Sequence, residues 1–214
     1  MARANVYIDG FNLYYGIRTR FPECKWLDPR KLAETLYPGE TIQRVRYFTA
    51  RVTARPDDPS QPQRQQAYLR ALETVDVEPH FGQFKSSTRR MKRASRCATA
   101  SCESPDKVDV FFTEEKGSDV ALGSYVLRDS FRKEMDTAIV VTNDTDLETP
   151  LRLARDELGI TIALVSPGKH AHETLRAHAD SVKTLRRKPL TASLLPWTLQ
   201  DQNGQIHCPP AWRE

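Results

Sequence analysis

The sequence predicts an α/β fold, in which a mainly parallel central sheet carries helices on both faces. Short apolar runs rich in β-branched and aromatic residues recur along the chain, as they do in buried strands. Segments with apolar residues at helical spacing lie between those runs, and this alternation is typical of strand–helix–strand units. The 214 residues are enough for one domain of this class.

The amino-terminal half is predicted to contain three strands and three helices. Residues 6–8 form the first strand and lead directly into a helix. Asp28 supplies an N-cap, and Pro29 a first-turn proline, for a second helix that extends to Leu36. The remaining elements are strands at 45–48 and 75–81 and, between them, a helix at 61–74 with alanine and leucine at helical spacing.

The carboxyl-terminal half continues the same alternation. Ser118 caps a helix that extends to Leu127, a strand follows at 138–142, and a helix at 149–158 ends at Gly159 before a strand at 160–165. Asn203-Gly204, between two short extended runs, predicts a tight hairpin. We therefore expect one domain over residues 1–188 and a C-terminal hairpin tail over 189–214.

Acidic residues recur where strands are predicted to end. Asp9 follows the first strand, and Asp144 and Asp146 follow the strand at 138–142. Open α/β sheets bind ligands at this edge, whereas carboxylates brought together without a cation repel one another. Asp119 stands in the first turn of the helix that Ser118 caps. Helix capping and a favourable first-turn charge are the alternative explanations for these acids.

Together these acids predict a site for a hard divalent cation, Mg²⁺ or Mn²⁺, which prefers oxygen ligands. Asn12, in the first turn after Asp9, can orient a metal-bound water or a phosphate oxygen, and Glu115 is a weaker candidate ligand. Such ions catalyse phosphodiester hydrolysis without a nucleophilic side chain. Accordingly, the sequence contains no nucleophile elbow, no phosphate-cradling glycine loop and no Rossmann fingerprint.

Residues 85–106 form a polar, basic segment that is predicted to leave the core as an insertion. The formal net charge is only +4, so the segment is a local positive patch on an otherwise balanced protein. We expect it to contact the phosphates of RNA, with DNA as the alternative partner; a solvated loop without a ligand is the alternative role. The predicted contacts are Lys85, Arg89, Arg90, Lys92, Arg93 and Arg96.

Three ordered motifs resemble the NYN domain, the bacterial branch of the PIN-like nuclease superfamily. They are Tyr7-Ile8-Asp9-Gly10-Phe11-Asn12, Glu115-Lys116-Gly117-Ser118-Asp119-Val120 and Thr142-Asn143-Asp144-Thr145-Asp146-Leu147. The resemblance covers roughly residues 4 to 185 and implies a PIN-like three-layer α/β/α sandwich with a Mg²⁺ or Mn²⁺ site and ribonuclease activity. Its implied catalytic and metal-binding acids are Asp9, Asp119, Asp144 and Asp146, with Asn12 beside them. One departure is Asn143, where many members carry glycine.

Two other functions stay open at this point. The protein can be a nucleic-acid-binding or adaptor module that keeps the acidic pocket without cleaving, or a phosphatase or phosphotransfer domain with Asp109 as its acceptor. Cleavage that requires Mg²⁺ or Mn²⁺ separates these functions. The sequence does not fix the substrate, the number of metal ions or the oligomeric state.

The remaining features favour ordinary roles. Four cysteines are too few for a disulfide framework in a chain of this length, and Cys97 and Cys102 are predicted to be free thiols rather than zinc ligands. His170, His172 and His178 are expected to be exposed polar side chains. No apolar stretch approaches the length of a membrane span, and no export signal precedes the first strand, so we expect a cytoplasmic protein.

Overall fold

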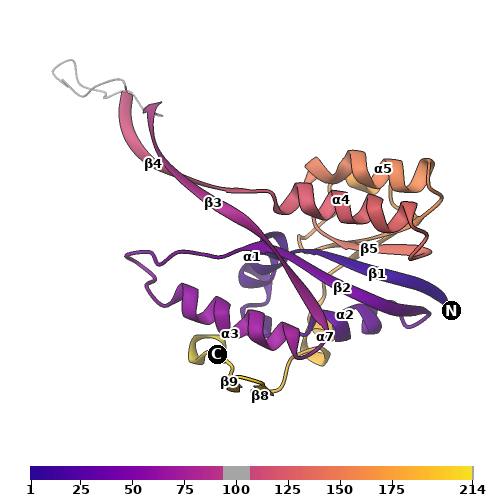
Figure 1. The fold of residues 1–214 in the computed structure, drawn as a ribbon, viewed down its shortest axis with the longest axis horizontal. Helices are drawn as coiled ribbons and strands as arrows, with labels where there is room; N and C mark the ends of the chain where they lie inside the picture. The colour runs from indigo at the N-terminus through magenta and orange to yellow at the C-terminus, as the bar shows by residue number, and fades with distance from the viewer. Residues whose placement is uncertain (94–106, 214) are drawn as a thin grey trace.

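The computed structural model describes residues 1–93 and 107–213, which form three layers, with a sheet in the middle and helices on either side (Figure 1). The sheet has seven strands in the order β4-β3-β2-β1-β5-β6-β7. Neighbouring strands are parallel except for the antiparallel pair β3 and β4. The strands are β1 (Ala2–Asp9), β2 (Glu40–Ala50), β3 (Val77–Lys92), β4 (Lys107–Lys116), β5 (Thr137–Val141), β6 (Thr161–Ser166) and β7 (Ser181–Thr184).

Helices cover both faces of this sheet, as the sequence predicts. The layer containing α4 and α5 lies on one side, and the layer containing α1, α2, α3 and α7 lies on the other (Figure 1). The helices are α1 (Gly10–Arg20), α2 (Pro29–Leu36), α3 (Gln61–Glu73), α4 (Ser118–Phe131), α5 (Glu148–Asp156), α6 (Glu173–Arg176) and α7 (Arg187–Ala192), with 3₁₀ turns η1 (Pro22–Cys24), η2 (Thr145–Leu147) and η3 (Pro210–Trp212). None of the described helices is long and apolar enough to cross a membrane.

Side chains of the central strands divide between two hydrophobic cores. On β1, Val6 and Ile8 pack in the core that includes Leu69 of α3, whereas Tyr7 packs in the core that includes Leu122 of α4. The division follows the alternation of side chains along a strand. Each such side chain contributes about 1.5–3 kcal/mol when fully buried, so both layers are tied to the same strand.

A buried polar cluster fixes α4 on the sheet. Asp129 of α4 is fully buried and accepts a hydrogen bond of 2.7 Å from the hydroxyl of Tyr7. It also pairs with buried Arg46 of β2 and with Arg128. Burial by itself would raise the pKa of Asp129, but these hydrogen bonds and the charge of Arg46 bring the pKa below its usual value. Asp129 is therefore an ionised anchor for the helix whose first turn carries Asp119.

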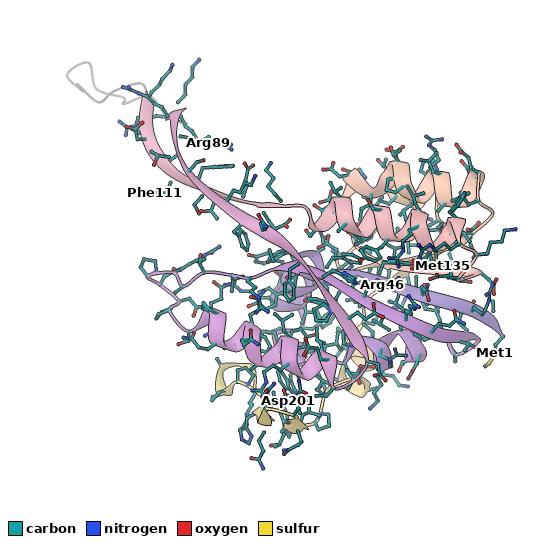
Figure 2. All side chains as sticks on the ribbon, in the orientation of Figure 1. Met1, Arg46, Arg89, Phe111, Met135 and Asp201 are labelled. Carbon is teal, nitrogen blue, oxygen red and sulfur yellow. The ribbon has the colours of Figure 1, made fainter. Side chains whose placement is uncertain are left out.

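Beyond Gly82, β3 and β4 leave the sheet as a two-stranded arm, formed by residues 83–92 and 107–116 (Figure 1). Figure 2 shows Arg89 and Phe111 on this arm, away from the layered body. The sequence analysis expects residues 85–106 to leave the core as an insertion and assigns no strand to them. Residues 85–92 do leave the layered body, but as a regular extension of β3, because each pairs with a residue of β4. Residues 94–106, with Arg96, Cys97 and Cys102, lie outside the described residues.

The predicted C-terminal hairpin is confirmed. It consists of β8 (Thr198–Asp201) and β9 (Gly204–His207), and Gly204 adopts a positive φ of 107° at the turn. Arg70 of α3 pairs with Asp201 at 2.6 Å, and Trp212 packs into the core on the α3 side of the sheet. The tail therefore belongs to the same packed body in the described part of the chain, and a domain boundary at residue 188 stays a prediction.

Candidate active site

Three of the predicted acids meet at the carboxyl edge of the sheet. Asp9 ends β1, Asp144 follows β5, and Asp119 lies in the first turn of α4, so that one carboxylate oxygen from each lies within 4.8 Å of the others. The strands β1 and β5 are parallel neighbours, so their carboxyl ends lie side by side. This is the one group of three or more potential metal-ligating side chains among the residues that the structure describes.

The arm brings Asp119 to this edge. Strand β4 runs back along β3 and ends at Lys116, opposite Gln83. Gly117 then turns the chain with a φ of +99°, a conformation that glycine adopts without steric cost, and α4 begins at Ser118. The long β3–β4 excursion thus returns α4 to the same edge at which β1 and β5 end.

Asp9 is 5% exposed and is held by hydrogen bonds to both carboxylate oxygens. Oδ1 accepts the backbone N–H of Asn12 at 3.0 Å, which caps α1, and Oδ2 accepts the hydroxyl of Thr142 at 3.0 Å. Burial raises the pKa of Asp9, and these hydrogen bonds only partly offset that effect; the nearby charge of Asp144 raises the pKa further. A cation would relieve this cost. Asn12 itself lines the groove beside the acids.

Thr142 connects two of the acids. Its hydroxyl donates to Asp9 and accepts the backbone N–H of Asp144 at 3.1 Å, and the side chain is fully buried. The sequence analysis assigns no role to this residue, because the link is made between two strands that are far apart in the chain. The neighbouring Asn143 accepts the backbone N–H of His172 at 2.7 Å, so its amide side chain anchors the loop that carries Asp144.

Asp119 experiences the strongest electrostatic penalty in the group. Burial is the largest cause, the charges of Asp9 and Asp144 follow, and together with Glu115 and Asp146 they raise its pKa to about 6. Glu115 accepts the hydroxyl of Ser118 at 2.6 Å and the backbone N–H of the same residue at 3.2 Å. Glu115, and not the predicted Ser118, therefore caps the first turn of α4, whose N-cap position is Gly117.

Asp146 lies near the group without joining it. Its side chain is exposed, and its backbone N–H donates to Asp144 Oδ1 at 3.0 Å, which caps η2. The charge of Asp146 contributes to the raised pKa of Asp119, so the two carboxylates are close enough to interact. A role for Asp146 as a direct ligand stays a prediction.

The acids open into a groove that adjoins the arm. Phe84 and Thr113, from the base of the arm, line it together with Arg55. Arg55 makes no ion pair among the described residues, and the sequence analysis does not single it out because it lies in an irregular loop. Among the described residues that line this groove, Arg55 is the cationic one.

The predicted phosphate-binding residues divide into two groups. Arg89 pairs with Glu114 at 2.6 Å, and its guanidinium lies 4.0 Å from the centre of the Phe112 ring, so it stabilises the arm. The other predicted residues within the described ranges are exposed and form no ion pair there; these are Lys85, Arg90, Lys92 and Arg93.

The donor set of the acidic group suits the predicted cation. Three carboxylates supply oxygen atoms, and no cysteine or histidine belongs to the group, so Mg²⁺ or Mn²⁺ fits better than zinc. Asp109 lies on the arm opposite Arg90 and outside this group, which removes the acceptor that a phosphotransfer function requires. His170 and His172 are exposed as expected, whereas His178 is partly buried and contacts Glu148 at 3.4 Å.

Comparisons with known proteins bear on both fold and function. A family profile for the NYN domain matches residues 3–186. The 6-hydroxy-3-succinoylpyridine 3-monooxygenase HspA of Pseudomonas putida is 29% identical over 244 aligned positions, which cover 98% of this chain and 75% of that protein. The crystal structure of VPA0982 from Vibrio parahaemolyticus, a protein of unknown function, superposes with a TM-score of 0.57 at 14% identity over 91% of this chain and 96% of the other, a likeness in fold alone.

Proposed function

The chain belongs to the NYN family of PIN-like nucleases, and on that premise we propose that it is a Mg²⁺- or Mn²⁺-dependent ribonuclease that hydrolyses phosphodiester bonds. The observation that carries the proposal is the meeting of Asp9, Asp119 and Asp144 within 4.8 Å at the carboxyl edge of the sheet. Hydrogen bonding and capping account for parts of this arrangement, but neither requires three carboxylates to converge.

In this proposal Asp9, Asp119 and Asp144 hold the cation. A divalent ion there supplies an activated water and stabilises the departing oxygen of the phosphodiester. Thr142 positions Asp9 and Asp144 through its two hydrogen bonds. A bound cation would favour the ionised form of Asp119, because its positive charge would offset the repulsion that raises the pKa of this carboxylate.

Cationic side chains bind the strand on either side of the acids. Arg55 contacts a phosphate within the groove, and the exposed cations of the arm, Lys85, Arg90, Lys92 and Arg93, contact phosphates further along the strand. Contacts of this kind act through charge, so they position the strand without reading its bases. RNA is the proposed substrate, and the same contacts are available to single-stranded DNA.

Incubation of the purified protein with end-labelled single-stranded RNA and DNA of one sequence tests the proposal. Separate reactions contain Mg²⁺, Mn²⁺ or chelator, and binding is measured in parallel by fluorescence anisotropy. We expect RNA cleavage with either ion and none with chelator. Retained binding without cleavage under any condition would instead support an adaptor that cleaves nothing, and a preference for DNA would correct the substrate.

One observation favours a second function. The similarity to a monooxygenase extends over 98% of this chain, including the tail that the NYN family profile does not cover. The corresponding candidate is oxygenation of a hydroxypyridine at the same groove. Oxygen consumption that requires both 6-hydroxy-3-succinoylpyridine and a two-electron reductant would support it, and its absence, together with metal-dependent RNA cleavage, would leave the nuclease.

A further inference from the structure

An aromatic pocket adjoins the acidic groove. Its lining includes six aromatic side chains, contributed by α1, β2, α3 and the C-terminal turn: Phe11, Tyr14, Tyr15, Tyr47, Tyr68 and Trp212. Phe11, Tyr15, Val52 and Gln61 line the acidic groove as well. The two hollows therefore share a wall, and a strand bound at the acids passes the mouth of the aromatic pocket.

The floor of the pocket is built rigidly. Tyr47, Tyr68 and Trp212 are each at least nine-tenths buried, and their rings meet edge to face, at 6.1 Å between Tyr47 and Tyr68 and 5.7 Å between Tyr68 and Trp212. The hydroxyl of Tyr47 donates to the carbonyl of Gly10 at 3.2 Å. Because Gly10 follows Asp9 directly, the floor is one residue away from the acidic group, and a Cβ at Gly10 would overlap Tyr47 at 2.5 Å.

The mouth of the pocket presents an exposed ring. Tyr15 is 46% exposed, forms no hydrogen bond among the described residues, and meets the ring of Tyr14 at 5.5 Å in an edge-to-face contact. It lies on α1, whose first turn Asp9 caps. An exposed ring that is held in position loses little conformational entropy when a flat ligand stacks on it. Gln61, at the shared wall, offers an amide donor and acceptor to the edge of such a ligand.

We propose that this pocket receives one nucleobase of the strand whose phosphate lies at the acids, with the base stacked on Tyr15. The inference rests on the proposed nuclease function and adds a base-binding subsite to it. A nucleobase combines flat apolar faces with a polar edge, which matches aromatic walls next to an amide. Because the pocket and the acidic groove share a wall, a base in the pocket can belong to the strand bound at the acids. The ribose phosphate of that nucleotide then extends into the groove lined by Arg55.

Binding measured without cleavage tests the subsite. A labelled oligouridylate of ten nucleotides and an abasic ribose-phosphate strand of the same length are titrated in chelator by anisotropy. We expect the base-bearing strand to bind about tenfold more tightly, a difference of about 1.4 kcal/mol, because one stacked base contributes a binding energy of this order. Tyr15→Ala should abolish this preference and Tyr15→Phe should keep it. Phe131→Ala is the matched control, because Phe131 is 78% exposed at the far end of α4.

Competition experiments show whether the ligand of the pocket is a nucleotide or a free heteroaromatic compound. Uridine 5′-monophosphate should displace the labelled strand at lower concentration than free uracil; equal or better competition by uracil would show that the pocket takes a small heteroaromatic compound instead of a nucleotide. No base preference in the wild type, or a preference that survives Tyr15→Ala, would overturn the subsite and leave the nuclease proposal standing. A clear preference without metal-dependent cleavage would overturn the nuclease and leave the ring-binding pocket.

Discussion

At the scale of single residues, the acidic group combines structural and chemical roles. Asp9 caps α1 and is also the most buried member of the group, and Asp144 caps η2 while its backbone N–H donates a hydrogen bond to the hydroxyl of Thr142. These caps fix the direction of the carboxylates before any ligand binds. Asp119 has no comparable hydrogen bond from the backbone of its own loop, and it is the member whose pKa is raised to about 6.

The raised pKa of Asp119 predicts a pH dependence of stability in the metal-free protein. Its pKa is about 6 in the folded state and 3.8 in the absence of the fold, so between these values the folded state binds more protons than the unfolded state. The free energy of unfolding of the wild type therefore decreases as the pH rises from 3.8 to about 6, because the folded state loses its extra proton. Asp119→Asn removes the effect, and its free energy of unfolding relative to wild type should increase from about pH 4 to about pH 6.5.

Urea unfolding of both proteins in chelator at several pH values measures this difference. Asp156→Asn, at an exposed position where α5 ends, is the matched control and should show no such trend. A difference between Asp119→Asn and wild type that stays constant with pH would show that the neighbouring acids do not perturb Asp119.

At the scale of elements, the sequence predicts the strands in the middle of the sheet and the helices better than it predicts the strands at the two edges of the sheet. The predicted strands at 45–48 and 138–142 lie at β2 and β5, because these runs consist mainly of apolar side chains that are buried on both faces of the sheet. The sequence analysis misses β7, which is short and partly exposed. It also assigns no strand to residues 85–92, because a polar strand is stabilised by its pairing partner and not by its own composition.

The same distinction applies to the candidate site. Asp9, Asp119 and Asp144 could be predicted because each lies near the end of a strand or in the first turn of a helix, and these ends converge in this fold. Thr142 and Arg55 could not, since their positions depend on contacts between segments that are distant in the chain. The aromatic pocket escaped the sequence analysis for the same reason.

The arm gives the element-scale prediction. Replacing Arg90, Lys92 and Arg93 with Gln should cost little stability, because all three are exposed and unpaired within the described residues, and surface changes usually stay within about 0.5 kcal/mol each. Arg89 is left in place because it supports the arm. Each lost phosphate contact on a single strand should reduce the slope of log affinity against log salt by about 0.7, or about 2 for the triple variant.

Anisotropy titrations of RNA at several salt concentrations measure that slope. A control variant with Gln at Lys31, Arg186 and Lys188 changes the net charge equally at exposed positions on α2 and around α7. An arm variant whose slope equals that of the control would show that the arm is solvated surface and that the strand binds elsewhere.

At the scale of the whole molecule, two layers and the returning arm meet at one edge, so a ligand bound there joins β1, β5 and α4. Mn²⁺ at about 100 times its dissociation constant should stabilise the folded state by about 2.7 kcal/mol. For a chain of this length, that raises the melting temperature by about 5–10 °C. A zinc-selective chelator should leave the melting temperature unchanged, whereas a loss of stability would indicate a zinc site outside the acidic group.

The most direct test of the central claim is single-turnover cleavage of labelled RNA by wild type, Asp144→Asn and the control Asp156→Asn in Mn²⁺. Asparagine keeps the shape and capping ability of Asp144 but removes a ligand charge, so the variant should fold, with equal or higher stability in chelator. We predict that cleavage is abolished in Asp144→Asn and unchanged in Asp156→Asn. Wild-type cleavage by a folded Asp144→Asn protein would contradict the assignment of the metal site to this edge of the sheet.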